Sequence, residues 1–219
     1  PNIDKKKFNF KTITIKSLPI GLQEILYAIS TWLIFYLILN NMSYSSVSFY
    51  NIGVQWAAVC TIIPSMLRNV ALKHLVDSKN NQISMLKILI LFNSLITLFF
   101  CLMVYFTYDY FTLIYGSEYE GVAIVILIAC LSAVFKTISS LFYQVYMSHD
   151  RNWRMLFLRS IRDLLIILTI IYYFESATKD TILVQYIFLF EIFINLIFLI
   201  FISLDTKKYF NSKISLLND

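Results

Sequence analysis

The stretch Gly121–Met147, GVAIVILIACLSAVFKTISSLFYQVYM, decides the fold of this chain. Its 27 residues are mostly apolar, and a helix needs about 20 such residues to cross the hydrocarbon core of a bilayer. Lys136 lies near the middle of the stretch, too far from either end to reach the membrane surface. A charge at that depth costs at least roughly 2.5–3.5 kcal/mol, so it normally faces a bundle interior or a water-filled cavity. The sequence therefore predicts a membrane-spanning helix with an inward-facing lysine.

Polar side chains recur at helical spacing along one side of this stretch, which makes Lys136 part of a stripe. Two interpretations of the lysine are open. It is either a structural charge paired with a carboxylate, or a residue that faces a transport cavity. The second is favoured because charges inside membranes are functional by default. The stripe consists of Ser132, Lys136, Ser139, Ser140 and Tyr143.

The composition is that of a membrane protein. Of 219 residues, 59% are hydrophobic and 14% are charged, whereas soluble domains are about 45–50% apolar and about 25% charged. The net charge of +5 does not indicate nucleic-acid binding, because no basic block accompanies a soluble domain that could present it. Membrane lipid is the expected surrounding. Cys60, Cys101 and Cys130 lie in apolar runs at no metal or redox spacing, so they are interpreted as packing residues and no cofactor is expected.

Six apolar segments predict an all-α integral membrane protein with six transmembrane helices in one bundle. Residues 1–16 are expected to be a cytoplasmic basic linker, 17–204 the bundle and 205–219 a cytoplasmic tail. The chain starts with Pro1 and a cationic leader, which is interpreted as an internal loop of a longer protein. The predicted spans cover residues 17–40, 48–72, 86–107, 121–147, 158–174 and 182–204.

Basic residues gather on one side of the predicted spans. The leader, the second and fourth connections and the tail together contain 16 of the 18 lysines and arginines. Because basic residues are retained in the cytoplasm, both ends of the chain are predicted to be cytoplasmic. The chain is therefore predicted to be a multi-pass membrane protein.

The first two segments have the most polar faces and supply most of the candidate site. In the first, Gln23 shares a face with hydroxyl residues, and Glu24 lies beside it about two turns into the span. Asn51 and Gln55 follow one side of the second segment, and Arg68 lies near its cytoplasmic end.

Two more segments carry charges. Glu191 in the sixth segment lies at a depth comparable to that of Lys136, and pairing would lower the cost of burying both, so we predict their contact. The fifth segment begins amid several charges, of which Arg159 and Asp163 are spaced to form an i,i+4 pair. A membrane-anchoring girdle is favoured there over a substrate site. Its members are Arg154, Arg159, Arg162 and Asp163.

The chain contains no recognisable catalytic motif. It has four glycines and no phosphate-binding glycine loop, and His74 and His149 have no partners at metal-ligand spacing. No nucleophile and base combination is visible. The expected function is therefore not enzymatic, and an integral-membrane glycan-modifying enzyme is the least favoured alternative.

Three stretches together resemble one family. They are SLPIGL at 17–22, NIGVQWAAVCTIIPSMLRNVALKHL at 51–75, and residues 113–150, where LIYGSEYEGV precedes a long helix that ends in QVYMSHD. In order and spacing they resemble the C-terminal half of Wzx-type polysaccharide and O-antigen flippases. These belong to the multidrug/oligosaccharidyl-lipid/polysaccharide exporter superfamily. The resemblance extends over nearly the whole chain, although the family's first six-helix bundle has no counterpart in it.

The resemblance implies that the protein lies in the bacterial inner membrane and that the chain helps to move an undecaprenyl-diphosphate-linked oligosaccharide across it by alternating access. A missing N-terminal half or a second copy would have to complete the transporter, and polysaccharide polymerase machinery is a possible partner. Lys136 would offset the diphosphate, Arg68 would receive it at the cytoplasmic entrance, and Gln23, Asn51 and Gln55 would bind sugar hydroxyls.

Two alternatives remain. A cation-coupled multidrug exporter of the same superfamily would use Glu24 or Glu191 as its ion site. A non-transporting membrane scaffold subunit would use its intramembrane charges only to hold helices together.

Overall fold

The computed structural model describes residues 10–77, 82–116, 119, 121–176 and 184–218, which form helices and no strands. Six helices are long, and α4 is a short helix that follows α3. The helices are α1 (Phe10–Asn41), α2 (Tyr44–Asp77), α3 (Gln82–Phe106), α4 (Tyr108–Tyr115), α5 (Val122–Ser148), α6 (Asn152–Ser176) and α7 (Val184–Asn218).

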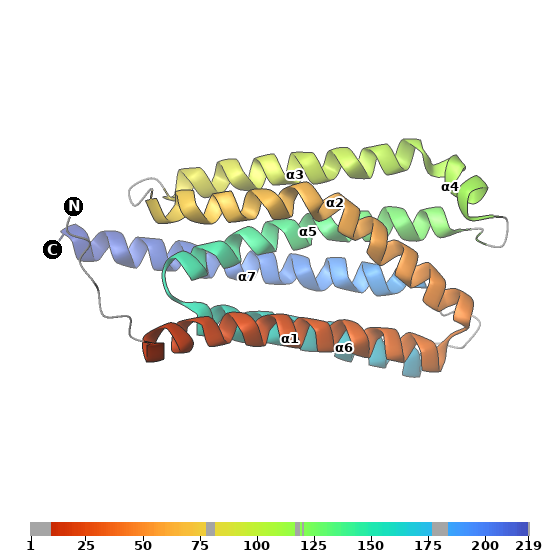
Figure 1. Ribbon diagram of the computed structural model, residues 1–219, viewed down its shortest axis with the longest axis horizontal. Coiled ribbons are helices and arrows are strands. Elements are labelled where there is room, and N and C mark those ends of the chain that lie inside the picture. The colour runs from red at the N-terminus through yellow and green to blue at the C-terminus, as the bar shows by residue number, and fades with distance from the viewer. Residues whose placement is uncertain (1–9, 78–81, 117–118, 120, 177–183, 219) are drawn as a thin grey trace.

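The long helices run alternately up and down, so that the start of α1 and the end of α7 lie at the same end of the bundle (Figure 1). This end also contains the turn between α5 and α6. It is called the basic end, because Lys16, Arg151, Arg154 and Lys207 lie there. The opposite end contains α4.

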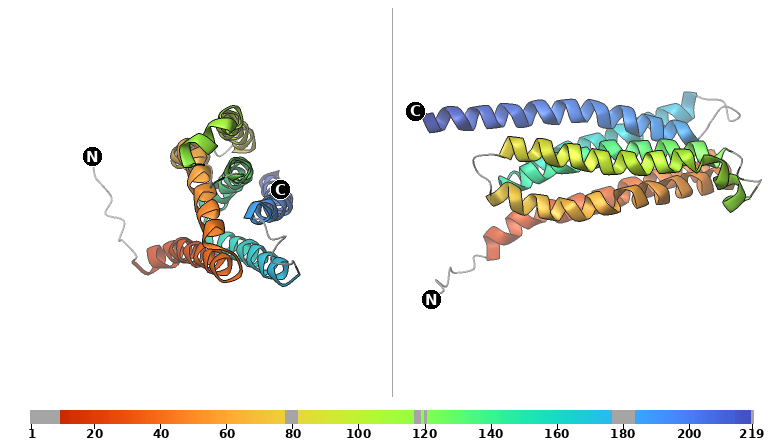
Figure 2. Two further views of the ribbon diagram at one scale, coloured as in Figure 1. Left: turned by 90° about the vertical axis from the view of Figure 1, so that its right-hand side faces the viewer. Right: turned by 90° about the horizontal axis from the view of Figure 1, so that it is seen from above.

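Helix α5 is the centre of the bundle. More than half of its apolar span is buried inside the protein, a larger share than in any other described candidate span. Helices α2, α3 and α7 pack around it, whereas α1 and α6 pack against each other to one side (Figure 2). Helix α2 crosses from beside α1 to beside α3. The stretch from which the fold was predicted is therefore the helix against which α2, α3 and α7 pack.

Five of the described helices, α1, α2, α3, α5 and α7, are long and apolar enough to cross a membrane. They indicate a multi-pass membrane protein. Five of the six predicted spans thus correspond to helices with the length and apolar character that a membrane span requires. Helix α6 has 25 residues and is long enough to span, but three arginines and an aspartate in its first half leave too short an apolar window.

The helices extend beyond the predicted spans at both ends of the chain. Helix α1 begins at Phe10, inside the expected linker 1–16. Its first turns are fastened to the α5–α6 turn, since the Lys16 ammonium lies 2.7 Å from the Asp150 carboxylate and the Asn152 amide donates to the Lys16 carbonyl. Residues 1–9 lie outside the described part of the chain.

Helix α7 continues to Asn218, through the expected tail 205–219. Asp205 anchors this extension, because it accepts a 2.5 Å hydrogen bond from the Tyr146 hydroxyl and pairs with Arg154. Thr206 is buried beside it. Helix α4 is a further difference, since it lies in the stretch 108–120 that was expected to be a connection.

Gly53 allows α2 to approach α7 and α5 closely. A Cβ atom at this position would lie 2.9 Å from two ring atoms of Phe188 and 3.2 Å from Val125. Phe188 is fully buried and stacks on Tyr50 at 5.3 Å, so its ring has little room to move. We expect Gly53→Ala to lower the free energy of unfolding by about 1–3 kcal/mol through overpacking.

Gly21→Ala is the matched control, because nothing lies within 4 Å of a Cβ atom at that position in α1. Alanine is there expected to stabilise the helix by about 0.5–1 kcal/mol. Titration with denaturing detergent in mixed micelles would measure both changes. Equal effects at the two glycines would contradict the close contact at Gly53, and Phe188→Leu should restore much of the stability lost by Gly53→Ala.

Candidate functional site

Two adjoining cavities lie between α1, α2, α5, α6 and α7. One, of about 170 Å³, lies among the middle parts of these helices. The other, of about 450 Å³, lies nearer the basic end. Both are lined by Tyr27, Thr61, Lys136 and Arg162, and we call the joined space the groove. Six charged residues line it, namely Glu24, Lys136, Arg159, Arg162, Asp163 and Glu191.

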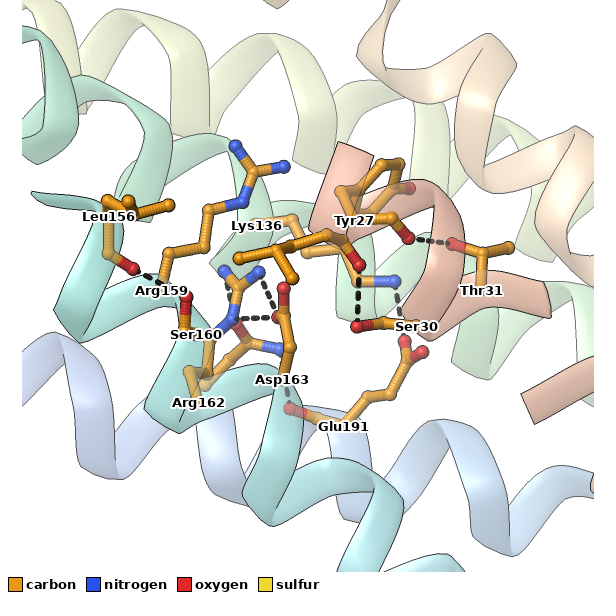
Figure 3. A network of polar contacts seen from close by, with 12 residues as sticks. Tyr27, Ser30, Thr31, Lys136, Leu156, Arg159, Ser160, Arg162, Asp163 and Glu191 are labelled. Atoms are coloured by element: carbon orange, nitrogen blue, oxygen red, sulfur yellow. Dashed lines mark hydrogen bonds and ion pairs between the residues drawn. The ribbon is translucent and has the colours of Figure 1, made fainter. Parts of the chain in front are cut away.

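Lys136 of α5 and Glu191 of α7 form an ion pair in the groove, with 2.5 Å between the Nζ and Oε2 atoms (Figure 3). The predicted contact between them is confirmed. The two side chains differ in exposure, since 37% of the lysine side chain is accessible and only 7% of the glutamate side chain. The lysine is therefore the more accessible member of the pair.

Arg162 and Asp163, neighbours on α6, form a second pair that is buried in full. The guanidinium donates to Asp163 Oδ1 through Nε at 2.9 Å and through Nη2 at 2.6 Å. A longer bond of 3.5 Å joins Nη1 to the amide oxygen of Asn195 on α7. Arg162 and Asp163 are 7% and 8% exposed. The girdle interpretation is wrong for both, since girdle charges face headgroups.

Arg159 turns from α6 toward α1. Its guanidinium lies 3.6 Å from Glu24 and 5.0 Å from the centre of the Tyr27 ring, a cation–π distance. The predicted Arg159–Asp163 pair is wrong, because Asp163 is bonded to Arg162 and Arg159 reaches another helix. In this pair the acidic side chain is the more accessible one, whereas in the Lys136–Glu191 pair it is the basic one. Of the Glu24 side chain 67% is accessible, and of the Arg159 side chain 15%.

The uncharged polar residues of the groove fall into two kinds. Most hydroxyls are bonded within their own helix, as Ser30 is to the Leu26 carbonyl and Thr61 is to the Ala58 carbonyl. By contrast, the Gln23 carbonyl oxygen and the Tyr143 hydroxyl are buried and have no hydrogen-bond partner among the described residues. Such groups are rare in folded proteins and call for an explanation.

The structure places some of the predicted site residues in the groove and others outside it. Gln23, Glu24, Lys136 and Glu191 all line the groove. Asn51 and Gln55 are exposed on α2 and line neither of its two cavities. Arg68 belongs to α2, but its side chain lies outside the described part of the structure.

The contribution of α6 to the site was not predicted from the sequence. Arg159, Arg162 and Asp163 were assigned to the membrane surface because they lie near the start of a segment. Their spacing contained a signal, since charges at i, i+3 and i+4 lie on one helix face, and a helix inside a membrane turns such a face inward. Asn195, one turn from Glu191, marks the same region on α7.

The site contains no metal-binding group, since no three His, Cys, Asp or Glu side chains among the described residues could together hold a metal ion. Cys60, Cys101 and Cys130 are buried away from the groove, where α2, α3 and α5 meet. All three side chains belong to the buried hydrophobic core.

Chemically, the groove is a set of fixed charges and hydrogen-bonding groups inside a mostly apolar bundle, suited to binding a polar ligand.

Comparison with known proteins identifies no relative of this chain. No protein-family model, no curated protein and no solved structure matches it.

Proposed function

We propose that this chain is one half of a transporter that moves an undecaprenyl-diphosphate-linked oligosaccharide across the bacterial inner membrane by alternating access. The observation that carries the proposal is the groove itself. Charged and hydroxyl side chains line it, although the helices that form it expose mainly large apolar side chains to their surroundings. Ionisable residues within membrane spans, facing a cavity, mark substrate pathways.

In this proposal α6 also crosses the membrane, which gives six spans in all, and both ends of the chain lie in the cytoplasm. Arg162 and Asp163 are two of the charges that make α6 less apolar than the candidate spans. Both are buried inside the bundle and do not face lipid, which supports a sixth span. Its remaining outer surface includes Phe157, Leu164 and Leu168, all exposed apolar residues. A helix of this kind can face lipid on one side and a polar bundle interior on the other.

A second half-bundle, or a second copy of this chain, would complete the transporter. Exposed polar side chains on α1 and α2 support this part of the proposal. Glu24, Asn51 and Gln55 lie within candidate spans and are exposed in the isolated chain, where contact with lipid tails would be unfavourable. Another polar surface against α1 and α2 would give them partners, and the two surfaces would enclose a wider cavity.

Within that cavity, Lys136 would offset the negative charge of the diphosphate. Gln23, whose carbonyl oxygen has no partner among the described residues, would accept hydrogen bonds from sugar hydroxyls. Asn51 and Gln55 would do the same from the exposed side of α2, and Arg68 would receive the diphosphate at the cytoplasmic entrance. The undecaprenyl tail would remain in the lipid.

A scaffold function is the second candidate, and the ion pairs favour it because they join different helices. Lys136 and Glu191 tie α5 to α7, and Arg159 and Glu24 tie α6 to α1. If this were their whole purpose, an apolar pair of similar volume would replace Lys136 and Glu191 without loss, since buried ion pairs can be exchanged in this way.

The double variant Lys136→Leu/Glu191→Leu separates the two candidates. In cells that depend on this gene for a surface glycan, transport predicts a loss of glycan of roughly tenfold or more, as expected when about 1.4 kcal/mol of binding is removed. A scaffold function predicts that the amount of surface glycan is unchanged. Immunoblotting would confirm equal protein levels, and Lys87→Leu, an exposed site on α3, is the control. Normal glycan in the double variant would refute the role of Lys136 in transport.

A further inference from the structure

The charges of the groove are balanced. Three of its charged residues are basic and three are acidic, and each basic group lies beside a carboxylate. A ligand that carries only negative charge would therefore meet Glu191 immediately behind Lys136. In a site of low dielectric, an added unpaired charge is strongly disfavoured. A ligand with charges of both signs would leave the site neutral.

The exposure of each pair determines which charge a ligand meets. Lys136 is the accessible member of its pair, and Glu24 is the accessible member of the pair with Arg159. Arg162 and Asp163 are both buried and contact each other (Figure 3). The 450 Å³ cavity, which is lined by Lys136 and Glu24, therefore offers a ligand one ammonium group and one carboxylate.

Two uncharged groups in the same cavity also lack partners. The Gln23 carbonyl oxygen can accept a hydrogen bond and the Tyr143 hydroxyl can donate one, and neither does so to any described residue. Both side chains are more than nine-tenths buried. A ligand, or water that a ligand displaces, would satisfy them. Together with the charges, they describe a site for a compact molecule rich in polar groups.

We propose that this cavity recognises a zwitterionic ligand, in which an acid group binds Lys136 and a protonated amine binds Glu24. The inference rests on the proposed function and names its substrate class, namely a lipid-linked glycan with a free amino sugar close to a phosphate or carboxylate. Acid and amine each form a charge-assisted hydrogen bond, while the formal charge of the occupied site stays balanced. A zwitterionic phospholipid headgroup shares this chemistry, and the experiment must distinguish it.

The test uses the full chain in nanodiscs of phosphatidylglycerol, which contains no amine. Binding of four soluble probes is measured by ligand-observed NMR at about pH 5, where a phosphate monoester, with a second pKa of about 6, carries mostly a single negative charge. The probes are glucosamine 1-phosphate, N-acetylglucosamine 1-phosphate, glucosamine and phosphoethanolamine. N-acetylation removes only the positive charge, so the first two probes form a matched pair. We expect glucosamine 1-phosphate to bind at least about tenfold more tightly than each of the other three, a difference of about 1.4 kcal/mol.

Variants test whether Glu24 binds the amine of the ligand and Lys136 its acid group. Glu24→Gln should abolish the preference for glucosamine 1-phosphate over its N-acetyl form, because it removes the carboxylate that binds the amine and leaves a net positive charge that favours an anionic ligand. Lys136→Gln/Glu191→Gln, which keeps the site neutral, should weaken both sugar phosphates. Asp109→Asn in α4 is the control, because Asp109 is exposed outside the groove. Melting temperatures of all variants would establish that they are folded.

Three results would overturn the inference. Equal affinity for the two sugar phosphates would mean that the amine is not recognised, and no binding of any probe would mean that the cavity is not a site for this class. Phosphoethanolamine binding as tightly as glucosamine 1-phosphate would assign the cavity to a lipid headgroup. None of these decides whether the chain transports glycans, which is judged separately from glycan production by Lys136→Leu/Glu191→Leu.

Discussion

Replacing Arg162 with leucine is expected to lower the free energy of unfolding by roughly 3–5 kcal/mol, the cost of removing one partner from a buried ion pair. Asp163 is only 8% exposed and accepts two hydrogen bonds from this guanidinium. Without Arg162, the carboxylate must remain charged without a partner or take up a proton. Asn195 would lose a bond as well. Unfolding by denaturing detergent, followed by circular dichroism, would measure the change.

The double variant Arg162→Leu/Asp163→Leu is the control. Removing both charges leaves no unpaired ion, so its stability is expected to lie much closer to that of the wild type. Lys16→Leu gives a second comparison, because 52% of the Lys16 side chain and 64% of the side chain of its partner Asp150 are accessible, and exposed ion pairs contribute about 0–1 kcal/mol. A single variant Arg162→Leu as stable as the wild type would contradict the buried pair.

Glu191→Leu is expected to have the second largest effect. It leaves the Lys136 ammonium in the middle of a membrane-spanning helix without its carboxylate, at a cost of roughly 2.5–3.5 kcal/mol. The effect should be smaller than that of Arg162→Leu, because Lys136 keeps access to the groove. The loss should appear as a lower melting temperature of the purified protein.

Adding Lys136→Leu to Glu191→Leu should restore most of the stability, and the double-mutant cycle should give a coupling energy of at least about 1 kcal/mol. Strictly additive losses would contradict the contact between the two side chains. The same double variant tests transport in cells, so stability and function can be read from one protein. A stable double variant without glycan would assign the pair to transport rather than to assembly.

Charged residues of the site could be predicted from the sequence where each lies alone in an apolar run. Lys136 and Glu191 were predicted to meet because each is costly within a span and their depths match, and the structure places them together. The same reasoning failed for Arg159, Arg162 and Asp163. They lie near the start of a segment, where the sequence cannot tell a charge that faces headgroups from one that turns inward.

The polar face of α2 shows a second limit. Asn51 and Gln55 were predicted to line a cavity because they follow one side of a helix, but hydrophobic and polar spacing determines only which residues share a face. It does not determine what lies opposite that face. In the structure, the groove is reached instead by Ala57, Ala58 and Thr61 of α2, because the helix crosses the bundle obliquely.

The sequence by itself determined the helical class, the central membrane span around Lys136 and the gathering of basic residues at one end. Each of these depends on length, apolar content or charge along the chain, which are properties of single segments. Only the tertiary structure decided how α1 and α6 pair beside the α5 core and which charge balances which. The Arg162–Asp163 pair, the contact of Arg159 with Glu24 and the neutral groove all depend on the rotation and crossing of packed helices, which arise from side-chain packing between segments far apart in the chain.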